Sequence, residues 1–244
     1  MSVAATGWDT KPRTFIEHVR AMFRPDVLRR LRHDLDALEL ERSRMASTDR
    51  ERRAMARGET SDALRLDARW YDAWRDAVDR ALPQVGPFRW VIVPPQVRIV
   101  RDGRAHLVPW HQDLAFQQAL GSRGHQRAIT CFVPIDDNPA KHTTLQYCRD
   151  AAPLLAHGPL DGFAAGIRDV PGMDRVSFDL TLGDALVFGD LAIHRSFVPP
   201  GATVERRSLE FRLVRPDEAI ADKDYFDLEL GLFVRTDGTR RSQP

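Results

Sequence analysis

A histidine and an aspartate separated by a single residue are the side chains in this sequence best suited to hold a metal ion. Successive side chains of an extended segment point to opposite faces, so His111 and Asp113 would project to the same side. A later histidine, for which we select His194, would complete a set of two imidazoles and one carboxylate. Such a set occupies one face of an octahedral ion and leaves the opposite positions open for substrate and oxygen. We therefore predict an enzyme with a metal ion bound by these three residues.

The length and composition of the chain limit the number of domains and the classes of binding partner. A chain of 244 residues that is 43% hydrophobic is long enough for one substantial core, and we expect a single domain over residues 1–244. The 36 basic and 35 acidic residues give a formal net charge of +1. This balance lacks the excess of positive charge that is typical of proteins that bind nucleic acid or an anionic membrane. We expect neither a signal peptide nor a membrane span, and Cys131 and Cys148 form no metal or redox motif. We expect a cytoplasmic protein with a small-molecule substrate, and no nucleic-acid or membrane partner.

The elements that must position the site change in type about a third of the way along the chain. Residues 12–45 are predicted to be helical with a corner at Pro25, and residues 62–81 to form a helix with an aromatic face. Short apolar runs then predict many strands, which favours a barrel or sandwich over residues 83–235 with the helical portion, residues 1–82, packed on its outside. The strands are expected at 88–93, 96–101, 104–109, 127–135, 143–147, 176–180, 185–188, 194–198, 207–214 and 227–234.

A hairpin is predicted around Asp102 and Gly103, because an Asp-Gly pair between two alternating segments is a strong signal for a two-residue turn. In the resulting register Gln96 and Arg98 face the same side as His111. A buried guanidinium needs an anionic partner, so Arg98 indicates an anion inside the barrel. A structural salt bridge, or a bulge that turns Arg98 to solvent, is the alternative.

The candidate ligands lie within a series of four segments that follow one another along the chain. The segments are Trp110 to Asp113, Ile129 to Asp137, Gly183 to Phe188 leading into His194, and Arg206 to Leu209. In this order, over roughly half of the chain, they resemble the iron(II)- and 2-oxoglutarate-dependent dioxygenases of the phytanoyl-CoA dioxygenase-like superfamily. The resemblance implies a double-stranded β-helix, or jelly roll, whose mouth holds Fe(II) through His111, Asp113 and His194. It also implies 2-oxoglutarate as co-substrate and O2 as oxidant.

The resemblance further implies an arginine, a dozen or so residues after the second histidine, that clamps the distal carboxylate of 2-oxoglutarate. Arg206 and Arg207 both meet this spacing. The strand face that carries Arg207 is otherwise apolar, and a lone guanidinium on a core-facing strand needs a buried acidic partner, so we select Arg207. A bridge from Arg207 to a carboxylate of the protein is the alternative. Thr130 and Ser196 are further candidates for contacts with the co-substrate.

The reaction implied by the resemblance converts 2-oxoglutarate to succinate and CO2 while the substrate is hydroxylated. Related halogenases replace the metal-binding aspartate by a small residue, so Asp113 favours hydroxylation, or a related desaturation or ring closure, over halogenation. The segment from Asn138 to Tyr147 departs from the family, so the family's substrate is not carried over. An inward Arg98 would suit a small polar or acidic metabolite in a biosynthetic pathway. The alternatives are a non-catalytic cupin-like protein that binds a metal or a small acid, and an oxygen-independent metal enzyme of the same barrel class.

Overall fold

In the computed structural model the described residues form two antiparallel β-sheets, a separate β-hairpin and one long helix. The residues that the structure describes are 7–45, 86–93, 96–100, 107–115, 127–149, 153–161, 163–170, 174–218, 224–235 and 240–241. The helix is α1 (Pro25–Met45), and short 3-10 helices lie at Trp8–Thr10, Pro139–Lys141 and Pro216–Glu218.

The strands fall into a larger sheet, a smaller sheet and a separate hairpin. The larger sheet contains β1 (Ile16–Val19), β2 (Trp90–Val93), β3 (Gln96–Val100), β4 (Ala128–Pro134), β9 (Ala185–Gly189), β11 (Arg206–Val214), β12 (Asp224–Asp227), β13 (Leu232–Arg235) and β14 (Arg240–Arg241). The smaller sheet contains β5 (Thr144–Cys148), β8 (Arg175–Ser177) and β10 (His194–Phe197), and the hairpin contains β6 (Gly158–Leu160) and β7 (Phe163–Gly166).

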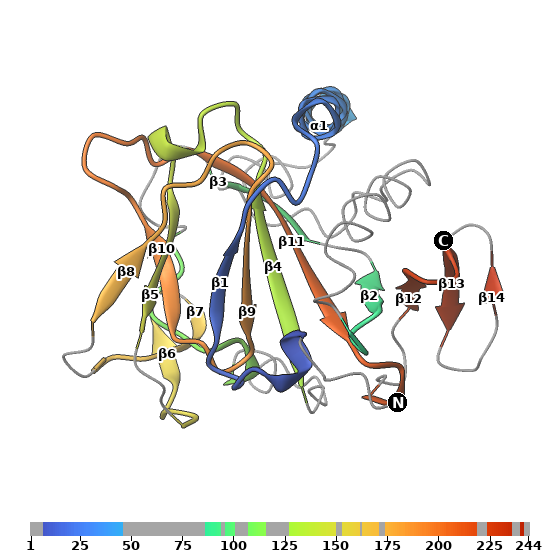
Figure 1. Ribbon diagram of the computed structural model, residues 1–244. Coiled ribbons are helices and arrows are strands. Elements are labelled where there is room, and N and C mark those ends of the chain that lie inside the picture. The colour runs from blue at the N-terminus through green and yellow to red at the C-terminus, as the bar shows by residue number, and fades with distance from the viewer. Residues whose placement is uncertain are drawn as a thin grey trace.

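The order of the strands is that of a jelly roll. Within the described residues the larger sheet has the order β1-β9-β4-β11-β2-β12-β13-β14, with β3 also paired to β11, and the smaller sheet has the order β10-β5-β8. Figure 1 shows β1, β9, β4 and β11 side by side, with the smaller sheet next to them and α1 seen end-on. The expected mainly β jelly roll is therefore confirmed.

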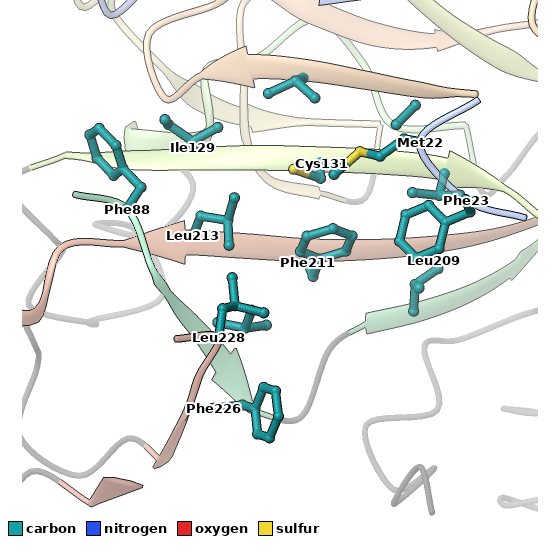
Figure 2. Close-up of a cluster of buried hydrophobic side chains, with 14 of the residues drawn as sticks. Met22, Phe23, Phe88, Ile129, Cys131, Leu209, Phe211, Leu213, Phe226 and Leu228 are labelled. Atoms are coloured by element: carbon teal, nitrogen blue, oxygen red, sulfur yellow. The ribbon is translucent and has the colours of Figure 1, made fainter. Parts of the chain in front are cut away.

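An outer core covers one face of the larger sheet. Figure 2 shows Ile129 and Cys131 of β4 beside Phe211 of β11, all on the same face. Leu28 and Leu31 of α1 belong to the same buried cluster. Residues two apart on a strand share a face, so the odd-numbered residues of β4 and β11 point into this outer core. In the described part of the chain, α1 thus packs on the outside of the sheet.

An inner cluster lies between the two sheets. Phe132 of β4 and Phe188 of β9 pack there against Leu145 and Tyr147 of β5. Because β4 has one face in the outer core and the other in the inner cluster, all of its residues are buried. Neither face of the larger sheet is exposed to solvent along β4. Both sets of alternating side chains therefore lie inside the protein.

The N-terminal segment differs from the expected helix. Pro25 begins α1, as its position at a first helical turn predicts, but residues 16–19 form β1 and pair with β9. Phe15 and Met22, which fit a helical stripe by their spacing, are both buried in the outer core. By pairing with β9, the segment satisfies backbone groups at the edge of the sheet that a helix would leave without partners. Tertiary pairing overrides local periodicity here.

Some expected elements lie outside the described residues. These are the helix at 62–81 and the turn at Asp102 and Gly103, together with the beginning of the strand expected at 104–109. Residues 227–234, which we expected to form one strand, instead contain the last residue of β12, a turn and the first residues of β13. Among the helices that the structure describes, none combines the length and the apolar character needed to cross a membrane.

Gly189, at the end of β9, lies against the backbone of Arg13. A Cβ atom at this position would lie 2.6 Å from the carbonyl carbon of Arg13 and closer still to its oxygen. Gly189→Ala is expected to lower the free energy of unfolding by about 1 to 3 kcal/mol, the usual cost of overpacking, in urea denaturation. Gly158→Ala is the control, because no atom lies within 4 Å of its Cβ position. Identical urea midpoints for the two variants would contradict the close approach at Gly189.

Candidate metal centre

Three side chains from two distant parts of the chain converge on one point. One potential ligand atom of each of His111, Asp113 and His194 lies within 4.8 Å of the others, and all three residues are buried. Asp113 Oδ1 lies 3.6 Å from His111 Nε2 and 3.8 Å from His194 Nε2. The structure thus brings together the three residues that the sequence singled out as metal ligands.

The two histidines are held together by their backbones. The N–H of His111 donates to the carbonyl oxygen of His194 at 2.9 Å, and the N–H of His194 donates to that of His111 at 3.0 Å. The segment around His111 is not the extended strand that we expected, because the chain is helical from Asp113 to Ala115. The carboxylate of Asp113 therefore reaches the histidines through a turn of the chain and not through strand alternation.

The hydrogen bonds of both imidazoles direct the Nε2 atoms toward a common point. Nδ1 of His111 lies 2.9 Å from the carbonyl oxygen of Pro109, and Nδ1 of His194 lies 2.9 Å from that of Ala192. A carbonyl oxygen only accepts, so each Nδ1 donates a hydrogen bond, and Nε2 is the nitrogen that the neutral ring would offer to a metal. Burial, followed by the neighbouring His111, lowers the pKa of His194 to about 4. Both rings are thereby set in the tautomer that binds a metal through Nε2.

The two oxygens of Asp113 have different partners. Oδ1 faces the imidazoles, whereas Oδ2 accepts a hydrogen bond from the hydroxyl of Thr130 at 2.6 Å and one from Arg212 Nη2 at 3.4 Å. Burial raises the pKa of Asp113, but the charge of Arg212 and the two histidines hold it well below its usual range. Asp113 is therefore an ionised carboxylate with one oxygen directed toward the histidines. Thr130, which we expected to contact a co-substrate, instead orients this carboxylate.

Removal of the Thr130 hydroxyl is expected to weaken metal binding. Thr130→Val keeps nearly the same shape but leaves Asp113 Oδ2 without its shortest hydrogen bond. Loss of such an outer-shell partner typically lowers metal affinity by about 10- to 100-fold, which calorimetric titration with Mn(II) would measure. Thr130→Ser retains the hydroxyl and should bind Mn(II) like the native protein. Equal affinities for the valine and serine variants would show that the hydroxyl does not position Asp113.

The inner face of β11 carries polar side chains from Arg206 to Arg212, and one of them contacts the metal centre. Arg212 defines this face because its guanidinium contacts Asp113. Arg206 shares the face, is 1% exposed, and lies with its guanidinium 5.1 Å from the ring of Phe132 in the inner cluster. Its Nη2 lies 3.6 Å from Oε1 of Glu210, the next charged residue on the same face. Of the two neighbouring arginines, Arg206 is the one on the side of the metal centre.

Arg207 points to the opposite face, and the expectation that it reaches the metal centre is wrong. Its Nη2 lies 3.1 Å from Oδ1 of Asp36 in α1, and its Nη1 lies 3.4 Å from Oδ1 of Asp136. The alternative reading, a bridge to carboxylates of the protein, describes these contacts. The apolar face of β11 faces the outer core (Figure 2), so a cation on that face lies beneath α1 and not in the barrel interior.

Ser196, Gln96 and Arg98 complete the set of expected site residues. Ser196 accepts a hydrogen bond at its hydroxyl oxygen from the N–H of Val108, and its own N–H donates to the carbonyl of Val108. These bonds hold the segment before the metal-binding motif against β10, which is a structural role. Gln96 and Arg98 pair in register with even-numbered residues of β11. Their side chains lie outside the described part of the chain.

Gln112 has a structural role that the sequence did not reveal. It is fully buried. Its amide nitrogen donates to the carbonyl oxygens of Leu191 and Pro153 at 2.8 and 3.1 Å, and its amide oxygen accepts from the N–H of Leu155 at 2.8 Å. Gln112 therefore links the metal-binding motif to two other segments, a role that depends on long-range contacts and leaves no local pattern.

Tyr147 is a second residue that the sequence did not single out. It pairs in register with His194, and the two rings stack with centroids 5.8 Å apart at 27°. Tyr147 is fully buried, and its hydroxyl has no hydrogen-bond partner among the described residues. Burial, together with the charges of Asp113 and Glu210, raises the pKa of Tyr147 well above its usual value. The ring of Tyr147 thus lies beside that of His194, and its buried hydroxyl is neutral.

Solved structures of non-heme enzymes share this fold. A non-heme monooxygenase, ThoJ in a nickel complex, matches with a TM-score of 0.60 and 15% identity over 95% of this chain and 86% of that one. ThoJ in its apo form matches with a TM-score of 0.55 and 18% identity over 84% and 75%. The epimerase SnoN, in complex with Fe3+, alpha ketoglutarate and nogalamycin RO, matches with a TM-score of 0.51 and 16% identity over 83% and 80%. No protein-family model matches the sequence, and no curated protein matches it. At these identities the comparisons establish a shared fold, and they support the resemblance at that level.

Proposed function

We propose that the protein is an Fe(II)- and 2-oxoglutarate-dependent oxygenase, a single domain over residues 1–244, that hydroxylates a small polar or acidic metabolite. The observation that carries this proposal is the convergence of His111 Nε2, His194 Nε2 and Asp113 Oδ1. Two imidazoles and one carboxylate are the facial ligand set of non-heme Fe(II) oxygenases, although manganese, nickel or zinc also bind such donors. The fold shared with a non-heme monooxygenase supports the same assignment.

The donors that are present fit such an ion. Both imidazoles are fixed by bonds from Nδ1 to carbonyl oxygens, and the second oxygen of Asp113 is occupied by Thr130. This arrangement favours one bond from Asp113 to the metal, so that three ligand atoms would come from the protein. The remaining positions of an octahedral ion would then be open for a co-substrate and oxygen.

We assign the distal carboxylate of 2-oxoglutarate to Arg206. Its guanidinium is buried on the inner face of β11, whereas that of Arg207 lies on the outer face. A planar guanidinium can form two parallel hydrogen bonds to a carboxylate, which gives both affinity and orientation. The ring of Phe132 supports the guanidinium from one side. Arg206 would thereby set the direction in which the 2-oxo acid reaches the metal.

In the proposed mechanism the protein positions reactants and excludes water. A bound Fe(II) ion would supply the activation of oxygen at the expense of 2-oxoglutarate, which leaves as succinate and CO2. His111, Asp113 and His194 would fix which positions around the ion are open. Phe188 and Tyr147 pack against the ring of His194, which keeps water from that side of the ligand.

The fold alone does not determine the outcome of the reaction, because the neighbours with this fold include a monooxygenase and an epimerase. The carboxylate of Asp113 supports hydroxylation over halogenation, because no position is left for a halide in its place. The polar or acidic character of the substrate continues to rest on Arg98 and is part of the proposal.

Succinate formation tests the proposed function. Metal-free protein is loaded with Fe(II) under argon, and 2-oxoglutarate and then O2 are added. We expect succinate only when all three are present, at a slow rate without substrate and at a higher rate when a screen of metabolites by oxygen consumption finds one. Protein that binds Fe(II) and 2-oxoglutarate but forms no succinate would favour the non-catalytic binding protein instead.

A further inference from the structure

We propose that His157 is a positioning residue for the metal centre, and that its imidazole takes the place of a strand carbonyl beside the metal-binding motif. This inference rests on the proposed function, because Gln112 separates the proposed ligands His111 and Asp113. The backbone N–H of Gln112 donates to Nε2 of His157 at 3.0 Å. Nδ1 of the same ring lies 2.8 Å from the carbonyl oxygen of Leu155. Both ring nitrogens are engaged, so His157 acts on the site through the peptide between two ligands and not as a ligand itself.

The backbone of the motif shows what the imidazole replaces. At a β-bridge the N–H and C=O of one residue point to one side, and the C=O before it and the N–H after it point to the other. His111 bonds to β10 through both of its backbone groups. On the other side, the carbonyl oxygen of Trp110 accepts from the N–H of Ile167 at 2.7 Å. A neighbouring strand would also place a carbonyl oxygen opposite the N–H of Gln112, and Nε2 of His157 occupies that position.

The hairpin of β6 and β7 is attached to the motif at both of its ends. His157 immediately precedes β6, and Ile167 immediately follows β7. The side-chain amide of Gln112 bonds in addition to the carbonyl oxygen of Pro153 and to the N–H of Leu155. The segment before the hairpin is therefore held to this one residue of the motif through its backbone and through its side chain.

Only a ring with an available lone pair can fill this position. A carbonyl oxygen accepts and a backbone N–H donates, so His157 carries its proton on Nδ1 and its lone pair on Nε2. Burial lowers the pKa of His157, which favours this neutral form, although the bond to Leu155 acts against it. Without the acceptor, the N–H of Gln112 loses its partner and the motif can leave the geometry that its ligands need. The apparent metal affinity then falls with the fraction of molecules that keep this geometry.

The test uses two amides of different length. Glutamine can place its amide oxygen about as far from Cα as Nε2 of histidine, whereas asparagine reaches only the position of Nδ1. Calorimetric titration with Mn(II) compares the native protein with His157→Gln and His157→Asn. We expect His157→Asn to bind Mn(II) roughly tenfold more weakly, which matches the usual cost of an unpaired buried N–H. His157→Gln should bind Mn(II) as the native protein does, and urea midpoints of the metal-free proteins show that each variant is folded.

Hydrogen exchange in the native protein provides a second measurement that depends on neither variant. Coupling between two sites is reciprocal, so if the His157 contact strengthens metal binding, then the metal strengthens the contact. Mn(II) should therefore slow the exchange of backbone amides in residues 153–157, which contain none of the three proposed ligands. The Leu155 N–H, which donates to the amide oxygen of Gln112, is the reporter in this segment.

His142→Asn is the matched control, because His142 lies on a different loop and its Nδ1 is 3.1 Å from the carbonyl oxygen of Glu205. This variant should keep the native affinity for Mn(II). Equal Mn(II) affinities for His157→Gln and His157→Asn would overturn the inference, as would exchange in residues 153–157 that does not respond to Mn(II). Native protein that binds no Mn(II) would instead defeat the proposed metal centre, and this inference with it.

Discussion

Asp113→Ala is expected to abolish metal-dependent turnover and to weaken Mn(II) binding by more than about 100-fold, beyond the usual effect of losing an outer-shell partner. Asp113 supplies the only carboxylate oxygen directed at the two histidines in the described site. Without it two imidazoles remain, and the positive charge of Arg212 has lost its anionic partner next to the ion. Calorimetric titration with Mn(II) measures the affinity directly, and succinate formation with Fe(II) measures turnover.

Thermal unfolding provides a second measurement of the same change. A ligand that binds only the folded state raises its stability, so Mn(II) should raise the unfolding temperature of the native protein and not that of Asp113→Ala. Asp36→Ala is the control, since this carboxylate is exposed on α1 and pairs with Arg207. It should bind Mn(II) as the native protein does. If Asp113→Ala retained native affinity for Mn(II), the proposed ligand set would be incorrect.

Arg206→Met and Arg207→Met are expected to have opposite consequences for the co-substrate. Arg206→Met should raise the Kd for 2-oxoglutarate roughly 30-fold or more, because truncation of one partner of a buried charged pair commonly costs about 2 to 5 kcal/mol. Arg207→Met should leave that Kd unchanged, since its guanidinium contacts Asp36 and Asp136 on the outer side of β11. Titration of the Fe(II)-loaded variants under argon separates the two residues.

Two controls accompany this pair of variants. The affinity for Mn(II) should be close to native in both, because neither arginine contacts His111, Asp113 or His194 in the described interactions. The urea midpoint shows whether each variant is folded, and Arg207→Met should have the smaller effect on it because its side chain is 32% exposed. A raised Kd for 2-oxoglutarate in Arg207→Met alone would restore the assignment made from the sequence.

The sequence predicted the fold and the three candidate ligands because both leave local patterns. Short apolar runs separated by turn residues indicate strands, and the segments around His111 and His194 follow the order of a known superfamily. The choice between Arg206 and Arg207 failed for a physical reason. Strand alternation shows that the two side chains lie on opposite faces, but it does not show which face is the interior. In this barrel the polar face of β11 lines the interior.

Other features were hidden because they depend on contacts between distant segments. The N-terminal strand fits a helical stripe until the edge of β9 is considered. The approach of Asp113 through a helical turn is not visible in a two-residue spacing. Tyr147 reads as one residue of an ordinary strand, and only the pairing of β5 with β10 brings its ring beside that of His194.

The two buried faces of β4 and β11 have a consequence for engineering. Odd-numbered positions such as Cys131 and Phe211 lie in the outer core, while even-numbered ones such as Thr130 and Arg212 meet the carboxylate of the site. The outer core is thus built from one set of alternate residues, and the polar groups of the site come from the other set. A combinatorial library restricted to the polar even-numbered positions could diversify the chemistry of this barrel while the outer core and the inner cluster around Phe132 are left unchanged.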